Sequence, residues 1–371
     1  MKAFDLIIVG AGFAGLACAE AAARHNLKTL VLERKHDVGG HIQTTGILVQ
    51  ELADEWNVPQ RLTRKISGVR LYSPSLDWID LSSPGYCFLA TDTPALMQWQ
   101  LRQAEAAGAR IRLDTHYTSS RYVNGRHYLK SGDVRCRFLA GCDGARSRVA
   151  KNYHLGSNRH FLIGIEAIYA PVMDIDQDKL HVFLDSVLAP GYIAWLAPGV
   201  HGTHVGLAAR FPVAPRLQDF IRKIAPLVNL AHLHPVCHRA GVIPCGGPVS
   251  NRSDENVMLI GDAAGMASPL TAGGIHPAVR SGRIAGEAIA HYLDHGGAWP
   301  GEVVQDTIPQ MLFKKSLRSV YNRVSIPNAL LDAMLKTPAF QALAQTVFFH
   351  HRGLLSPAAW RDLIRIFNPP R

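Results

Sequence analysis

The chain has 371 residues, of which 47% are hydrophobic and 18% charged, a composition that predicts a folded protein with more than one packed unit rather than a disordered chain. The net charge of +10 admits anionic partners. No nucleic-acid-reading motif accompanies the dispersed basic residues, so we expect no nucleic acid partner. The six cysteines form no CxxC pair and predict reduced thiols in a cytoplasmic protein. No window has the roughly 18 uninterrupted apolar residues of a membrane span.

The first predicted elements form a strand, turn, helix and strand near the start of the chain. The sequence FDLIIVGAGFAGLACAEAAARHNLKTLVLERK places Gly10, Gly12 and Gly15 in GxGxxG spacing after an apolar strand. The first glycine permits a tight turn, the second lets the backbone approach a pyrophosphate, and the third lets helix and strand pack closely. A second strand, 29–32, ends at Glu33. This context predicts dinucleotide binding.

The acidic residue narrows the choice of dinucleotide. Glu33 stands 18 residues after Gly15, where a carboxylate can accept both hydroxyls of an adenosine ribose. A free 2′-hydroxyl indicates FAD or NAD rather than NADP.

A second predicted motif lies far along the chain, in VMLIGDAAGMASPLTAGGIHPAVRSGRIAGEA. An apolar strand, 257–260, runs into Gly261 and Asp262, and a long helix begins near Ile275 after two glycines. A carboxylate in such a turn can accept hydrogen bonds from the ribityl hydroxyls of a flavin, which NAD lacks. The helix N-terminus would supply a positive dipole end.

A third motif lies between these two, in RFLAGCDGARSRVAKNYHL, where Asp143 and Gly144 follow an apolar strand. The three motifs in this order resemble the FAD-dependent oxidoreductases of the p-hydroxybenzoate hydroxylase fold. The resemblance implies FAD as the cofactor. It also implies an α/β fold with a Rossmann-type FAD-binding domain of the glutathione-reductase-like GR2 kind, an inserted antiparallel β-sheet substrate domain and a C-terminal helical segment.

The resemblance assigns three regions to the chain. We expect a discontinuous FAD-binding domain at 1–65, 90–150 and 251–295, a β-rich substrate domain at 66–89 and 151–250, and a helical region at 296–371. The cofactor residues expected on this basis are Gly10, Gly12, Ala14, Gly15, Glu33, Arg34, Thr45, Asp143, Gly261, Asp262, Pro269, Gly273, Gly274 and Ile275.

The stretch GYIAWLAPG, in the predicted substrate sheet, resembles the YxWxFP element of the geranylgeranyl reductase family. That resemblance implies that Tyr192, Trp195 and Pro198 line a site for an isoprenoid chain. The spacing here is YxxW, and a regular strand would place the two rings on opposite faces unless a bulge intervenes. Core packing of both rings is the alternative.

Geranylgeranyl reductases often have a cysteine in the loop after the first acidic residue, whereas HDVGGHIQTTG contains none. Another group must then donate the proton that alkene reduction requires. The candidates are Tyr192, His41, His276 and Cys245. The cluster LAHLHPVCHR lacks a paired ligand set with tetrahedral spacing, and we expect no metal there.

The residues after about 300 place apolar side chains at helical spacing with basic residues between them. Such helices pack on their own domain or a second subunit, or lie on a membrane surface. The packed arrangement is the commoner one.

The resulting hypothesis is an FAD-dependent oxidoreductase that reduces carbon–carbon double bonds of an isoprenoid or other apolar, lipid-like substrate. NAD(P)H or another reduced donor would bind transiently, because no second GxGxxG exists. Two alternatives stay open: a single-component flavin monooxygenase, and a redox-neutral flavoprotein. The expected location is the cytoplasm, with peripheral contact to the inner face of the membrane as an option, and both a monomer and a homodimer fit.

Overall fold

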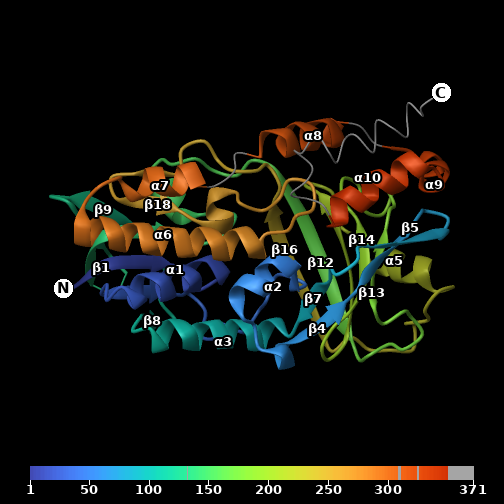
Figure 1. The fold of residues 1–371 in the computed structure, drawn as a ribbon, viewed down its shortest axis with the longest axis horizontal. Helices are drawn as coiled ribbons and strands as arrows, with labels where there is room; N and C mark the ends of the chain where they lie inside the picture. Colours follow the sequence, from blue (N-terminus) through green and yellow to red (C-terminus); the bar gives the residue numbers. More distant parts are fainter. Residues whose placement is uncertain (132, 308–310, 324–325, 350–371) are drawn as a thin grey trace. The chain divides into compact units, whose positions relative to one another are not determined.

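The computed structural model describes residues 1–131, 133–307, 311–323 and 326–349 (Figure 1). The chain divides into two compact units, each built from three segments. The first unit contains Met1–Ile42, Thr93–Phe161 and Ile243–Arg318, and the second contains Gln43–Asp92, Leu162–Val242 and Ser319–Arg371. These limits place 43–65 in the second unit. The functional assignment of the three expected regions stays a prediction.

The first unit is organised around an eight-stranded sheet in the order β17-β18-β11-β1-β2-β8, with β10 and β9 added beside β11. Its strands are β1 Lys2–Val9, β2 Thr29–Leu32, β8 Arg110–Arg112, β9 Ser120–Val123, β10 Arg126–Leu129, β11 Val134–Gly141, β17 Ser253–Asp254 and β18 Val257–Leu259. The pairs β8–β2, β2–β1, β1–β11 and β11–β18 are parallel. Both faces of the central strands are buried, which is why they are almost wholly apolar.

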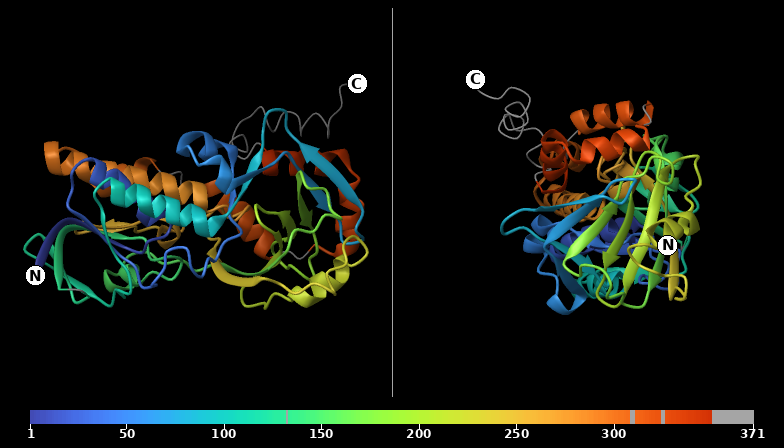
Figure 2. Two further views of the ribbon diagram at one scale, coloured as in Figure 1. Left: turned by 90° about the horizontal axis from the view of Figure 1, so that it is seen from below. Right: turned by 90° about the vertical axis from the view of Figure 1, so that its right-hand side faces the viewer.

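Three long helices lie side by side against this sheet: α1 Phe13–Arg24, α3 Thr93–Ala106 and α6 Ile275–His295. Figure 2 shows α1 between the other two. The small side chains of α1 permit close contact with α6, where Gly282 and Gly286 face the α1 backbone. The remaining helices of the unit are α4 Arg148–Asn152, the 3-10 turn η2 Gly261–Ala264 and α7 Pro300–Thr307. The helix α8, Leu312–Arg323, begins in this unit.

The second unit contains a seven-stranded sheet in the order β16-β12-β15-β14-β13-β5-β6. Its strands are β5 Gly68–Tyr72, β6 Trp78–Ser82, β12 Phe161–Tyr169, β13 Lys179–Phe183, β14 Ala194–Pro198, β15 Thr203–Arg210 and β16 Cys237–Pro244. The pairs β12–β15, β15–β14, β14–β13 and β5–β6 are antiparallel, whereas β13 and β5 run parallel. A three-stranded sheet joins β3 Ile47–Leu48, β4 Thr63–Ile66 and β7 Phe88–Thr91. The short helices α2 Gln50–Trp56 and η1 Gln60–Leu62 complete this region.

Alternation along the strands gives the seven-stranded sheet two different faces. On one face, Ala167, Ala194 and Leu207 join a core that is closed by Phe220 of α5, Leu217–Ile224. On the other face, β5 and β13 share a second core with α9 Asn328–Leu335 and α10 Pro338–Phe349. The same face of β12, β14 and β15 carries Glu166, Trp195 and His204, which are hydrogen-bonded to one another through the carboxylate.

The elements expected from the sequence are present, with two differences. The strand expected over 192–198 begins at Ala194, and Tyr192 lies in the preceding turn. The substrate sheet is not wholly antiparallel.

The C-terminal region is helical as far as it is described, through α10, and the rest of the predicted helical tail, 350–371, lies outside the described residues. Within the described part of the chain, no helix combines the length and apolarity needed to cross a bilayer.

Candidate functional site

The turn between β1 and α1 shows why its glycines are needed. Gly10 has φ +102°, and an added Cβ would lie 2.4 Å from the carbonyl oxygen of Cys142. A Cβ on Gly15 would lie 1.9 Å from the carbonyl oxygen of Gly10. Gly12 is exposed, and a Cβ there would meet no protein atom within 4 Å. Two glycines therefore serve packing, and the third leaves open space at the start of α1.

Glu33 lies at the carboxyl end of β2, beside this turn. Its side chain is buried, and its two oxygens accept hydrogen bonds from the backbone N–H groups of Ala11 (2.8 Å) and Lys35 (2.9 Å). The carboxylate is thereby fixed next to the helix N-terminus, with lone pairs remaining for further donors. Ala14 is buried in the first turn of α1, whereas Arg34 is exposed.

Asp262 lies in the loop that follows β18. Its side chain is half-buried, and burial raises the pKa of its carboxyl to about 6. Gly261 beside it has φ +61°, and a Cβ there would lie 2.7 Å from the Cβ of Ala14. The glycine therefore lets this loop approach α1.

Asn158 joins this loop to the one after β11. Its Nδ2 donates to the carbonyl oxygens of Ala145 (3.0 Å) and Asp262 (2.8 Å). Its buried Oδ1 has no hydrogen-bond donor among the described residues. Sequence reasoning missed Asn158, because nothing local indicates that an asparagine at this position bridges two distant motifs.

The start of α6 completes this group. Gly274 is the N-cap residue, and Ile275 opens the helix. A Cβ on Gly274 would lie 3.3 Å from Oδ1 of Asp262, so the helix N-terminus and the carboxylate are close neighbours. Pro269 is buried and Gly273 exposed in the connecting loop. His276 follows in the first turn of α6, half-buried.

Asp143 makes local hydrogen bonds. Its carboxylate accepts from Ser147 Oγ (2.6 Å) and from the backbone N–H groups of Arg148 (2.6 Å) and Val149 (3.2 Å). These bonds organise the N-terminus of α4. A direct role of Asp143 at the cofactor stays a prediction.

The cofactor residues of the first unit fit FAD. The open space at Gly12 and the first-turn amides of α1 suit a pyrophosphate. Glu33 suits the adenosine ribose and Asp262 the ribityl hydroxyls. Thr45, also expected at the cofactor, belongs to the second unit.

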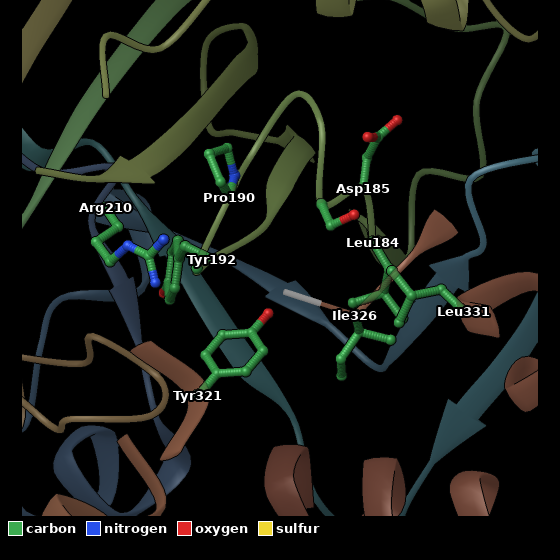
Figure 3. A pocket seen from close by; sticks show the side chains of 10 residues that line it. Leu184, Asp185, Pro190, Tyr192, Arg210, Tyr321, Ile326 and Leu331 are labelled. Atoms are coloured by element: carbon green, nitrogen blue, oxygen red, sulfur yellow. The ribbon is translucent and has the colours of Figure 1, made fainter. Parts of the chain in front are cut away.

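Tyr192 lines a small hollow within the second unit. Figure 3 shows its ring beside Arg210, with Tyr321 across the hollow. Ile326 and Leu331 form an apolar side. The hollow therefore has aromatic, cationic and aliphatic surfaces.

Trp195 is not among the residues lining this hollow. Its Nε1 donates to Oε2 of Glu166 at 2.9 Å, on the face of the sheet opposite α5. Oε2 also accepts from Thr45 Oγ1 (2.6 Å), and Oε1 accepts from His204 Nδ1 (3.0 Å). Arg239 Nη1 lies 3.6 Å from Oε1. We call these five residues the Glu166 cluster. Sequence reasoning missed Glu166, His204 and Arg239, because a carboxylate inside an apolar strand was the only local signal.

The remaining candidates are dispersed. His41 is exposed, with φ +49°, and its carbonyl oxygen accepts from Lys35 Nζ (3.0 Å). Cys245 is buried, and desolvation raises the pKa of its thiol. Pro198 is buried at the end of β14. In the ranges that the structure describes, no three His, Cys, Asp or Glu side chains gather to hold a metal ion.

Comparison with known proteins adds the family to this geometry. Residues 8–56 match the model of an NAD(P)-binding Rossmann-like domain. Digeranylgeranylglycerophospholipid reductase 2 of Methanopyrus kandleri is 30% identical over 318 residues, which cover 78% of each chain. The corresponding reductase of Methanosarcina mazei is 26% identical, over 95% of this chain and 94% of that one. The chain belongs to the digeranylgeranylglycerophospholipid reductase family.

Solved structures agree with that family in fold. A geranylgeranyl bacteriochlorophyll reductase-like protein of Thermoplasma acidophilum superposes with a TM-score of 0.83 at 19% identity, over 99% of this chain and 100% of that one. Aklavinone-11 hydroxylase, solved with FAD and aklavinone, superposes with a TM-score of 0.61 at 19% identity, over 78% and 62%. Membership of the digeranylgeranylglycerophospholipid reductase family confirms three expectations: the α/β fold with a Rossmann-like FAD-binding domain, the kinship with geranylgeranyl reductases, and an FAD-dependent reductase activity.

Proposed function

We propose that this enzyme reduces carbon–carbon double bonds in the isoprenoid chains of a glycerophospholipid. The observation that carries the proposal is the 30% identity to a digeranylgeranylglycerophospholipid reductase over 78% of both chains. Three features of the first unit that are compatible with FAD support it: the glycine turn before α1, the buried carboxylate of Glu33, and the N-termini of α1 and α6. Each double bond gains one hydride and one proton, so the product contains two more hydrogens per bond reduced.

FAD, once bound and reduced by the electron donor, would supply the hydride in this chemistry. The chain's own residues hold the cofactor: the α1 N-terminus its pyrophosphate, Glu33 its ribose and Asp262 its ribityl chain. In the second unit, the residues around Tyr192 and Trp195 are proposed to orient the isoprenoid chain and exclude water. An isolated alkene is a poor hydride acceptor. Correct orientation of the alkene and exclusion of water from the site therefore account for much of the rate acceleration. The proton donor is proposed among Tyr192, His41, His276 and Cys245.

The test is an anaerobic single turnover. The bound flavin is reduced with dithionite, a digeranylgeranyl glycerophospholipid is added, and flavin absorbance and lipid mass are followed together. The expected result is reoxidation of the flavin, with the lipid gaining two hydrogens for each flavin reoxidised. If the flavin stays reduced and an oxygenated lipid forms once air is admitted, the enzyme is a monooxygenase. Product formed with no net electron consumption would instead identify a redox-neutral flavoprotein.

The electron donor is proposed to bind only transiently. One dinucleotide fingerprint is present and FAD occupies it in this proposal, so NAD(P)H or another reduced donor would reduce the flavin in a brief encounter. Stopped-flow reduction with NADH, NADPH and a reduced ferredoxin would identify which donor is competent.

The helix α8 suggests how a lipid substrate is reached. Its apolar side chains point outward: Leu312, Leu317 and Val320 are 67%, 38% and 58% exposed. Two of its charged side chains point inward, since Arg318 is 2% exposed and Lys315 Nζ donates to the carbonyl oxygen of Pro248 (3.1 Å). This is the reverse of an ordinary surface helix.

We infer that the outward face of α8 rests on a lipid bilayer. The substrate of the relatives is a phospholipid, the chain has a net charge of +10 that favours an anionic surface, and Arg323 is exposed at the end of the helix. Leu317→Glu/Val320→Glu should abolish co-sedimentation with vesicles that contain phosphatidylglycerol. The matched control, Gln305→Glu/Thr307→Glu on α7, adds the same charge to another exposed helix and should still bind. Equal binding by both variants, or binding of neither the parent nor the variants, would overturn the inference. A concentration-dependent dimer lost in the α8 variant would show that a second copy covers this face.

A further inference from the structure

The Glu166 cluster forms a polar site inside the second unit that neither the motifs nor the family comparison assigns. Glu166 is only 3% exposed, and it lies in the middle part of β12, between the edge strand β16 and β15 of the seven-stranded sheet. A buried carboxylate is costly unless paired, and apolar residues of similar size often stabilise a core better. The sheet nevertheless keeps this charge, which indicates a use other than stability.

The two carboxylate oxygens have divided roles. Oε2 accepts from Thr45 Oγ1 and Trp195 Nε1, while Oε1 faces His204 Nδ1 and Arg239 Nη1. Arg239 also donates to the carbonyl oxygen of Thr44 at 3.0 Å. The carboxylate therefore connects three strands of the sheet with the loop before β3.

The cluster fixes the charge of Glu166. Burial alone would raise the pKa of this carboxyl, but the hydrogen bond and charge of His204, followed by the hydrogen bonds of Thr45 and Trp195, lower it below its ordinary value. An ionised Glu166 can only accept, so Nδ1 of His204 must carry a proton.

The cluster also fixes the orientation of one ring. Glu166 pairs with Gly206 on β15, and Gly206 pairs with Trp195 on β14, so the three residues form one row across the sheet. The indole crosses the middle strand above Gly206, where an added Cβ would lie 2.6 Å from its Cζ2. The indole fits there because Gly206 has no side chain, and the hydrogen bond from Nε1 to Glu166 fixes the position of the ring.

We propose that Glu166 is a positioning residue of the substrate site, which sets the orientation of Trp195 and couples it to the Thr44–Thr45 loop. The proposal rests on the function proposed above, because it gives the oriented indole a place in the wall that receives the isoprenoid chain. Trp195 touches substrate in this scheme, and Glu166 acts through it.

The test is a double-mutant cycle between Glu166→Gln and Trp195→Phe on the FAD-loaded enzyme. Gln keeps the size of Glu but offers one acceptor oxygen, and Phe keeps an aromatic ring but removes the donor. Each single variant should lower kcat/KM for the lipid by about tenfold or more, mainly through KM. The double variant should be no worse than either single variant, because both remove the same contact. Trp78→Phe, an exposed tryptophan on β6 of the same sheet, is the matched control and should match the parent.

A second readout needs no turnover. The fluorescence that Trp195 contributes, obtained by subtracting the spectrum of Trp195→Phe from that of the parent, should change in Glu166→Gln and in the milder Thr45→Val. Additive effects on kcat/KM, or a Trp195 emission that is unchanged in both variants, would overturn the proposal. If Glu166→Gln does not fold, Thr45→Val takes its place, and the proposal is tested by its kcat/KM for the lipid, combined with Trp195→Phe, and by its Trp195 fluorescence. If the lipid is not reduced at all, the proposed function fails, while the fluorescence result still reports on the positioning role.

Discussion

Gly282 of α6 lies directly against the α1 backbone at Ala14, where an added Cβ would come within 2.3 Å of the Ala14 carbonyl oxygen. Gly286, one turn later, makes the same approach to Cys18, with a Cβ 2.6 Å from its carbonyl oxygen. The two helices that begin at the proposed cofactor motifs are thus held at backbone contact. The spacing between α1 and α6 is set by these two glycines.

Gly282→Ala should force α6 away from α1. Overpacking of this kind costs about 1–3 kcal/mol of unfolding free energy, and the displaced helix N-terminus should weaken FAD retention. Urea unfolding with the flavin content measured in parallel would check both effects. Arg280→Ala, at an exposed position of the same helix, should leave both unchanged. Equal behaviour of the two variants would contradict the role given to Gly282.

Gly12→Ala and Gly10→Ala should separate cofactor binding from folding. A Cβ on Gly12 meets no protein atom, so this variant should keep the parental unfolding free energy but lose FAD, because the methyl group occupies the space proposed for the pyrophosphate. Gly10→Ala should be destabilised, since φ is +102° and the Cβ meets Cys142. Thermal unfolding and flavin absorbance of both purified variants would test this. Parental flavin content in Gly12→Ala would place the pyrophosphate elsewhere.

Asp262 should make FAD affinity depend on pH. Burial raises the pKa of its carboxyl to about 6, and only the ionised form accepts hydrogen bonds from ribityl hydroxyls with both oxygens. Affinity should therefore fall by up to tenfold per pH unit below about 6. Titration of the apoprotein with FAD from pH 5 to 8 would measure this. Asp262→Asn, which does not titrate, should bind more weakly at pH 8 with a flat profile, and a parental profile in that variant would assign the titration to another group.

His127 should make the first unit lose stability in mild acid. The side chain is fully buried, its Nδ1 lies 2.7 Å from the Tyr153 hydroxyl, and burial lowers the pKa of the imidazole to about 4. The unfolded chain takes up a proton near pH 6.5, whereas the folded one does so only near pH 4. The contribution of the neutral imidazole to the free energy of unfolding is thus fully present above about pH 6.5. It is lost as the pH falls from about 6.5 to about 4, by about 3 kcal/mol at most.

The measurement is urea unfolding of the parent and of His127→Gln between pH 4 and 8. The variant should be less stable at pH 8 and should lack this part of the acid dependence. His116→Gln, at an exposed histidine, should follow the parent. An equally steep acid loss in His127→Gln would show that other groups are responsible.

Local patterns predicted much of the fold. The strand 29–32, the glycine turn before α1 and the start of α6 at Ile275 lie where the sequence placed them, because each depends on neighbouring residues. The Glu166 cluster could not be found in this way, since its members come from segments that only the sheet register brings together. For the helices after about 300, the sequence left open whether the apolar face packs inward or lies on a membrane surface. Helical spacing shows that a face exists, but only tertiary packing shows which way it points.

The division of each unit into three segments has a consequence for synthesis on the ribosome. The central strand β11 pairs with β1 on one side and with β18 on the other, so more than a hundred residues separate each partner from the next. The sheet of the first unit is incomplete until β18 has left the exit tunnel. The seven-stranded sheet of the second unit likewise waits for its last strand, β16. Nascent α1, which is rich in apolar residues, lacks its partner helix α6 until residues 275–295 have been made. Chaperone dependence during expression, rather than low final stability, is the cost expected from this chain topology.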